Sequence, residues 1–150
     1  MNINFEYVYN KIKKGEGNCI LKTAECSISF LMGFFIYSMI EIIDRGYTHW
    51  TMGITGGIIL MILYIINSSS GITLLKSCLI GALFITATEF LVGIVVNIIL
   101  KWNVWDYSEV PFNIMGQICL PFTLVWFILC IPAYFLCRFI RIFLRRECFS

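Results

Sequence analysis

Residues 74–100 read LLKSCLIGALFITATEFLVGIVVNIIL, and this stretch decides the class of the protein. It holds only two charged side chains, Lys76 and Glu89, and it exceeds the roughly 17–25 apolar residues that one membrane-spanning helix needs. Three further apolar runs cover about 27–43, 52–66 and 114–140. The second is short but reaches spanning length if Trp50 and Asn67 lie at the two headgroup levels. We therefore predict four transmembrane helices.

The composition excludes an ordinary soluble domain. Hydrophobic residues make up 59% of the 150 residues and charged residues 13%, against about 45–50% and about 25% in soluble domains. A domain of this size could not hide so much apolar surface from water. The net charge of +2 gives no reason to expect a nucleic-acid partner, so the expected partner is the lipid bilayer.

We predict an all-α protein, an integral membrane four-helix bundle with amphipathic helices at both ends. Residues 1–26 form a basic amphipathic segment, residues 27–140 the four-span domain, and residues 141–150 a basic tail. Basic amphipathic helices lie on anionic membrane surfaces. A purely topological role, in which the charges hold both ends in the cytoplasm, explains these segments as well.

The basic residues predict the orientation of the spans. Arg45 and Lys101 fall on one side of the four runs. The other nine fall on the opposite side: Lys11, Lys13, Lys14, Lys22, Lys76, Arg138, Arg141, Arg145 and Arg146. Because Lys and Arg accumulate in cytoplasmic segments, both termini are predicted to be cytoplasmic in a multi-pass protein of the cell membrane.

Small and polar residues at helical spacing predict the faces on which the helices pack. The third run offers Cys78, Ala82, Thr86, Glu89, Gly93, Asn97 and Lys101. The first offers Gly33, Tyr37, Glu41 and Arg45, and the fourth Cys119, Thr123, Trp126, Cys130, Ala133 and Cys137. We expect these faces to point inward and the cysteines to act as small packing residues.

Glycine and proline mark two further helix features. Gly53 and Gly57 in the second run form a small-xxx-small pair, which packs against another helix of the same chain or against a second copy. Pro121 and Pro132 lie within the fourth predicted span, where proline removes a backbone donor and tends to kink a helix. Such a kink either opens a cavity or simply fits the neighbouring helices.

Glu89 is the most informative single residue, because an ionised side chain near the bilayer centre costs on the order of 2.5–3.5 kcal/mol. Either it binds a proton or ligand, or it is a neutral acid hydrogen-bonded to Thr86 or to another helix. Glu41 precedes Arg45 by one helical turn, the favourable order for a local ion pair. Together with Asn97 and Asp106, these residues are the candidates for ligand or proton binding.

The segment between the third and fourth runs has two interpretations. Asp106-x-x-Glu109 resembles a capping box, and Pro111 suits a first helical turn, so the loop is predicted to cap the fourth span. The alternative is a lid over a cavity that opens outward.

Sequence motifs of common catalytic sites are missing. The chain has no G-x-x-x-x-G-K-[ST], and its single histidine, His49, excludes H-E-x-x-H and multi-histidine metal sites. Neither a cofactor nor an enzymatic activity is expected. An intramembrane enzyme built on Glu41, His49, Glu89 and Asp106 is the least favoured hypothesis.

Several segments together resemble the ABC-transporter type IV permease family, small four-span bacterial membrane proteins. They are YSMIE (37–41), RGYTHWTM (45–52), Gly56-Gly57, TEFLVGIVVN (88–97) and WNVWDYSEVPFNIMGQICL (102–120). The resemblance runs from about residue 37 to residue 141. It implies a permease that transports a small solute and works with a separate ATPase subunit. We also expect such a transport protein to assemble as a homo-oligomer. The alternative is a non-transporting membrane module that binds a lipid or a partner protein.

The predicted orientation can be tested by thiol labelling. In a cysteine-free background, single cysteines at Tyr47 and Glu109 should react with an impermeant thiol reagent added to intact cells, because both lie in predicted external loops. Cys148, retained alone, should react only after permeabilisation. Labelling of Cys148 in intact cells would overturn the orientation.

Overall fold

The computed structural model describes the backbone of residues 5–68 and 71–149, and the side chains of residues 22–68 and 71–144. Its elements are α1 (Phe5–Arg45), α2 (Trp50–Ser68), α3 (Leu74–Gly93), the π-helical turn η1 (Ile94–Ile99), β1 (Asn113–Ile114), β2 (Ile118–Cys119) and α4 (Leu120–Phe149). Within these described residues, four segments are long and apolar enough to cross a membrane: Lys22–Arg45, Trp50–Ser68, Leu74–Ile99 and Leu120–Leu144. The predicted four-span architecture is confirmed.

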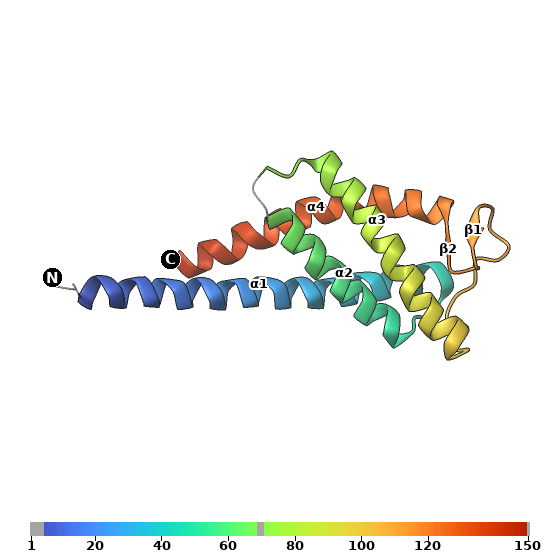
Figure 1. The fold of residues 1–150 in the computed structure, drawn as a ribbon, viewed down its shortest axis with the longest axis horizontal. Helices are drawn as coiled ribbons and strands as arrows, with labels where there is room; N and C mark the ends of the chain where they lie inside the picture. Colours follow the sequence, from blue (N-terminus) through green and yellow to red (C-terminus); the bar gives the residue numbers. More distant parts are fainter. Residues whose placement is uncertain (1–4, 69–70, 150) are drawn as a thin grey trace.

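The four helices form two closely packed pairs, α1 with α2 and α3 with α4 (Figure 1). The start of α1 and the end of α4 lie at the same end of the bundle. The short antiparallel hairpin β1–β2 lies at the opposite end, where Asn113 pairs with Cys119 and Ile114 with Ile118. Both ends of the chain therefore reach one side of the bundle, as a protein with four spans requires.

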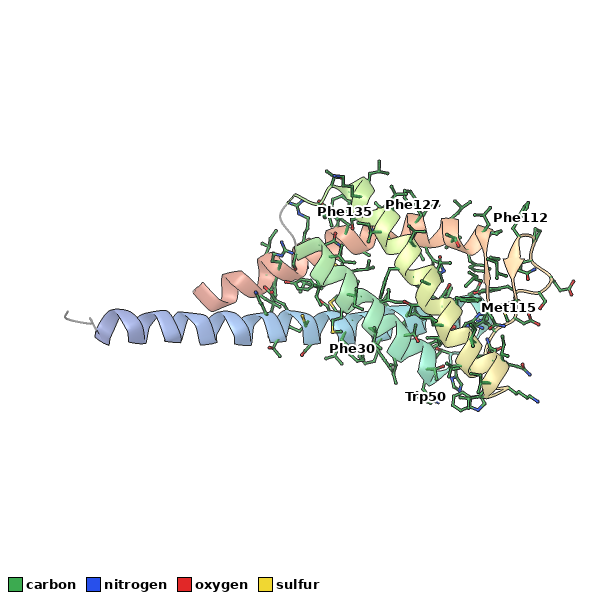
Figure 2. The ribbon with its side chains drawn as sticks, in the orientation of Figure 1. Phe30, Trp50, Phe112, Met115, Phe127 and Phe135 are labelled. Atoms are coloured by element: carbon green, nitrogen blue, oxygen red, sulfur yellow. The ribbon has the colours of Figure 1, made fainter. Side chains whose placement is uncertain are left out.

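The predicted inward faces are buried. Members that are less than a tenth exposed are Gly33, Glu41, Cys78, Ala82, Glu89, Gly93, Asn97, Cys119, Trp126, Cys130 and Cys137. Partly buried members are Tyr37, Arg45, Thr86, Thr123 and Ala133, and Lys101 at the end of its face is exposed. The outer surface carries large apolar side chains such as Phe35, Leu83 and Leu91, each more than half exposed, as a lipid environment requires. Phe135, which is also more than half exposed, is labelled in Figure 2.

Glycines on α1 and α2 allow the two backbones to approach closely. A Cβ at Gly53 would lie 2.7 Å from the Phe34 ring, and one at Gly57 would lie 2.7 Å from the Phe30 ring and 2.9 Å from the Phe30 carbonyl oxygen. The Gly53/Gly57 pair therefore packs within the chain. The alternative in which this face binds a second copy is wrong, because α1 already covers it.

The predicted start of the fourth span at residue 114 is also wrong. The apolar run continues through residues 114–119, but these residues form a turn and the hairpin, and α4 begins only at Leu120. Positive φ angles at Phe112, Met115 and Gly116 (56°, 54° and 67°) are incompatible with a helix. Pro121 consequently lies in the first turn of α4, where proline is tolerated, and only Pro132 lies inside the helix.

The N-terminal segment is continuous with the first span. Helix α1 runs unbroken through residue 26, the predicted end of the amphipathic segment. The side chains of residues 5–21 and 145–149 lie outside the described part, so the predicted amphipathic faces and domain limits remain predictions.

Gly56 provides a test of the α1–α2 contact. A Cβ at this position would overlap Tyr37 and lie 2.9 Å from the Gly33 carbonyl oxygen, which is backbone and cannot turn away. We expect Gly56→Ala to destabilise the fold by at least the ~1–3 kcal/mol typical of overpacking, seen as a lower melting temperature in detergent. Ala87→Leu, a small-to-large change on the exposed face of α3, is the control and should melt like the parent. An unchanged melting temperature for Gly56→Ala would contradict the contact.

Candidate functional site

Glu89 links three of the four helices. Its side chain projects from α3 and is 2% exposed. The Tyr37 hydroxyl of α1 donates to Oε1 at 3.1 Å, and Nε1 of Trp126 on α4 donates to Oε2 at 2.7 Å. The Tyr37 and Trp126 rings stack with centroids 5.9 Å apart. Each carboxyl oxygen thus has one donor, and each donor comes from a different helix.

Thr86 does not bind Glu89, so that predicted partner is wrong. The Thr86 hydroxyl instead donates to the Thr123 hydroxyl of α4 at 3.2 Å, and Thr123 donates to the Cys119 carbonyl oxygen at 3.1 Å. Sequence spacing placed Thr86 and Glu89 on one face, but Glu89 reaches across to α1 and α4. The partners on the other helices could not be paired with it from spacing alone.

Asn97 lies in the π-helical turn η1 and fixes the loop that follows. Its amide nitrogen donates to the Trp105 carbonyl oxygen at 3.0 Å and to Oε1 of Gln117 at 2.8 Å. Its amide oxygen accepts from the Val104 backbone nitrogen at 2.7 Å. The indole of Trp105 donates to the Gln117 carbonyl oxygen at 2.9 Å. Asn97 is therefore a structural residue that fastens the loop and the hairpin to α3.

Gln117 is the residue of this network that the sequence analysis did not select. It is 6% exposed, and its side-chain nitrogen donates to the Met115 carbonyl oxygen at 3.0 Å. A Cβ at Gly93 would lie 2.6 Å from Oε1 of Gln117, so a residue without a side chain is needed there. The only signal in the sequence was a polar amide inside an apolar run.

The predicted ion pair between Glu41 and Arg45 is confirmed at the outer end of α1. The Thr48 hydroxyl adds a hydrogen bond to Oε2 of Glu41 at 2.6 Å. Nη1 of Arg45 donates to the Val104 carbonyl oxygen at 2.9 Å. The Val104 N–H thus donates to Asn97, and the Val104 carbonyl oxygen accepts from Arg45. These two bonds fix the loop that follows η1 against helix α1.

Asp106 does not belong to a helix cap, and the capping-box prediction is wrong. No helix begins in this loop; instead the carboxylate accepts from the Ser108 backbone nitrogen at 2.8 Å and from the Ser108 hydroxyl, forming an Asx turn. These hydrogen bonds hold the pKa of Asp106 below its ordinary value, so the exposed carboxylate is ionised at neutral pH. Nearby, burial raises the pKa of Tyr107, which stacks on Phe122.

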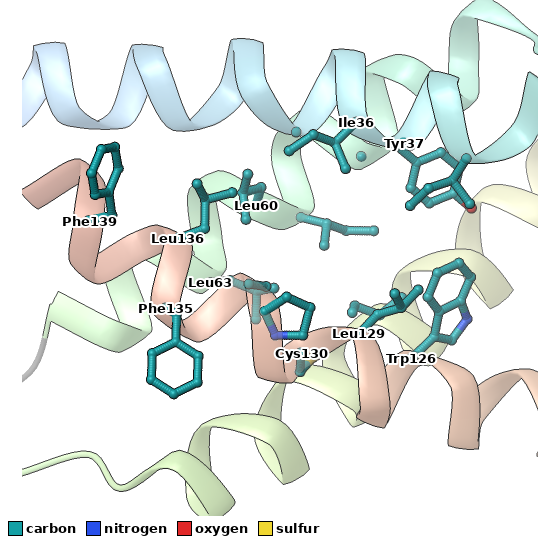
Figure 3. A pocket seen from close by; sticks show the side chains of 17 residues that line it. Ile36, Tyr37, Leu60, Leu63, Trp126, Leu129, Cys130, Phe135, Leu136 and Phe139 are labelled. Carbon is teal, nitrogen blue, oxygen red and sulfur yellow. The ribbon is translucent and has the colours of Figure 1, made fainter.

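A cleft lies between α1 and α4, with α2 at its back (Figure 3). Its inner section is a cavity of about 540 Å³ with apolar walls, and its outer section is a cavity of about 470 Å³ below the 101–107 loop. Four residues line both sections: Tyr37, Ile40, Trp126 and Leu129. Volumes of about 300–1,000 Å³ are typical of small-molecule sites.

The predicted site residues occupy two levels around this cleft. Glu41, Arg45 and Asp106 line its outer section directly. Glu89 lies behind Tyr37 and Trp126, which stand between it and the cleft, whereas Asn97 and Thr86 line neither section. The geometry can bind a ligand and couple it to the Glu89 carboxyl through Tyr37 and Trp126.

A third buried acidic residue, besides Glu89 and Glu41, was not selected by the sequence analysis. Glu25 on α1 is 2% exposed, although it belongs to the segment predicted to lie on the membrane surface. It faces the hydroxyl of Tyr64, whose ring lies 5.8 Å from the Arg141 guanidinium carbon. The mixed charges of the surrounding sequence concealed its burial.

Two substitutions separate hydrogen bonding from charge at Glu89. A glutamine can accept from Trp126 through its oxygen and donate to Tyr37 through its nitrogen, so Glu89→Gln should melt within a few degrees of the parent in detergent. Glu89→Leu leaves two buried donors without an acceptor, at about 1–3 kcal/mol each, and should melt clearly lower. Adding Trp126→Phe to Glu89→Leu should recover part of the loss. Equal melting of all three variants would show that these bonds do not support the fold.

Comparison with known protein families places these features in context. A family model described as "Putative ABC-transporter type IV" matches residues 32–148, which include the cleft, Glu89 and the loop with its hairpin. No curated protein and no solved structure matches the chain. The match covers more than half of the sequence, and the four apolar helices agree with a multi-pass membrane protein. The chain belongs to this family of ABC-transporter components.

Proposed function

We propose that this protein is the membrane-spanning component of a transport system and that its ligand occupies the cleft between α1 and α4. ATP hydrolysis comes from a separate subunit, since the sequence has no nucleotide-binding loop of the usual kind. The component lies in the cell membrane with both termini in the cytoplasm, an orientation that the distribution of basic residues supports. We further propose that it acts as a homo-oligomer. It is not itself an enzyme.

One observation supports this proposal above the others: Tyr37 and Trp126 line both sections of the cleft and both donate to Glu89. A ligand that moves either ring also changes the hydrogen bonding of the carboxyl. The two donors differ, because the indole can only donate whereas the tyrosine hydroxyl can also accept. When Glu89 takes up a proton, it can donate to Tyr37 while Trp126 keeps its bond.

Proton uptake would therefore keep both carboxyl oxygens of Glu89 hydrogen-bonded, and the Tyr37 hydroxyl proton would turn toward another acceptor. The site thus has two arrangements with the same side-chain packing. In one the Tyr37 hydroxyl donates to Glu89, and in the other it accepts from Glu89. A transport component needs such a two-state element, because a ligand can shift only an equilibrium between states that it binds differently.

The second candidate is a non-transporting module that holds a lipid or a partner protein in the same cleft. It is favoured by the apolar rim of the inner section, where Ile36, Phe135 and Phe139 are exposed on the surface that faces lipid. In that case Glu89 would only join the helices, and its titratable proton would not matter.

The two candidates predict different behaviour of Glu89→Gln in cells. If the proton of Glu89 is used, the variant should accumulate at the parental level and fail to complement a deletion strain, with at least about tenfold loss in competitive growth. Glu109→Gln, at an exposed glutamate outside the cleft, is the matched control and should complement fully. Full complementation by Glu89→Gln would exclude the proton-coupled function and favour the second candidate.

A further inference from the structure

We propose that the α1–α4 cleft binds an amphiphile that carries a cationic ammonium headgroup in the outer section and an apolar tail in the inner section. This inference rests on the cleft of the proposed function and adds the chemical class of its ligand. The two sections are continuous through Tyr37, Ile40, Trp126 and Leu129, so a single molecule can occupy both.

The inner section is built for an apolar chain. Its walls come mainly from aliphatic and aromatic side chains of α1, α2 and α4, as Figure 3 shows for Ile36, Leu60, Leu63 and Leu136. The hydroxyl of Tyr37 and the indole nitrogen of Trp126 are occupied by Glu89. A polar solute that enters this section would lose hydrogen bonds to water and find few groups to replace them. An apolar chain makes no such hydrogen bonds and has none to lose.

The section also opens on the lipid-facing surface. Ile36, Ile40, Phe135 and Phe139 line it and are 42%, 38%, 57% and 63% exposed. An apolar tail could therefore enter sideways from the bilayer without crossing water. An ordinary water-soluble solute has no such advantage at this opening.

The charges of the outer section select the headgroup. Arg45 is the single basic residue among the described residues that line it, and its guanidinium is taken up by Glu41 and the Val104 carbonyl oxygen. Two further carboxylates, Asp44 and Asp106, line the same section. The lining thus carries an excess of negative charge, which attracts a cation and repels an anionic headgroup.

Aromatic rings add a second recognition element for a cation. Tyr47, Trp105 and Tyr107 line the outer section together with the carboxylates. The Arg45 guanidinium carbon lies 5.7 Å from the centroid of the Tyr47 ring, so this ring already packs against a cation in the structure. Aromatic faces beside carboxylates are the usual surroundings of bound quaternary ammonium groups.

Fluorescence quenching of the purified full-length protein in nanodiscs tests the assignment. The probes are an alkyltrimethylammonium with a bromine on its tail and an alkyl sulfate of the same length and bromination. The ammonium probe should give saturable quenching that Trp126→Phe reduces, because its tail would lie against this ring. The sulfate should give only the weak, non-saturating quenching expected of random encounters in the bilayer.

Variants then separate headgroup from tail. Asp44→Asn combined with Asp106→Asn should weaken the ammonium probe by at least about tenfold, whereas Glu109→Gln should leave its affinity unchanged. Ala133→Phe fills the inner section and should also weaken binding; Ile36→Phe at the exposed rim provides the same test if Ala133→Phe folds poorly. Equal saturable binding of both probes, or no effect of the aspartate changes, would overturn the proposal.

Cross-linking tests whether a second copy of the chain, rather than an amphiphile, occupies the cleft. Efficient disulfide formation between copies carrying single cysteines at Ile36 and Phe139 would show that a second chain fills the cleft, and would overturn the assignment. Saturable ammonium binding together with full complementation by Glu89→Gln would support the ligand class and contradict only the proton-coupled function. Loss of complementation by Glu89→Gln, without saturable binding of the ammonium probe, would support the proton-coupled function and contradict the proposed ligand class.

Discussion

The hydrogen bonds between Glu89, Tyr37 and Trp126 are the interaction on which the arrangement of this bundle depends. Apolar side chains do not drive helices together inside a bilayer, because lipid surrounds them equally well, so close packing and polar contacts determine which faces meet. Glu89 is 2% exposed and receives one donor from α1 and one from α4. Rotation of any of these three helices would leave a polar group unsatisfied, so a single carboxyl fixes three helix orientations.

A second polar network performs the same task at the outer end. The loop after α3 is irregular backbone, and its groups need partners close to the bilayer. Asn97 satisfies Val104 and Trp105, while Arg45 reaches from α1 to the Val104 carbonyl oxygen. The π-helical turn places Asn97 toward the loop, an arrangement often found near functional positions. The loop forms a fixed roof over the outer section of the cleft.

The sequence allowed prediction of features that depend on local periodicity. The four spans, the inward faces and the Glu41–Arg45 pair follow from helical spacing and are present. The hairpin was missed because residues 114–119 remain apolar while the backbone turns at Phe112, Met115 and Gly116. The partners of Glu89 were missed because they come from other helices, and the burial of Glu25 because hydropathy averages a residue with its charged neighbours. Contacts between distant elements leave no periodic signal in one sequence.

The cleft itself follows from how unequally the helices approach one another. Glycines bring α1 against α2, and small residues bring α3 against α4; Gly81, for example, has the Cys130 sulfur 2.7 Å from where a Cβ would stand. The α1–α4 contact lacks such a seam and is bridged through Glu89 at the level of Tyr37 and Trp126. Below this bridge, Pro132 cannot donate a backbone hydrogen bond within α4 and lines the cavity. The two closely packed pairs are therefore joined across the cleft by the Glu89 bridge and by the bond from Arg45 to Val104, while α2 contacts α3 and α4 at the back of the cleft.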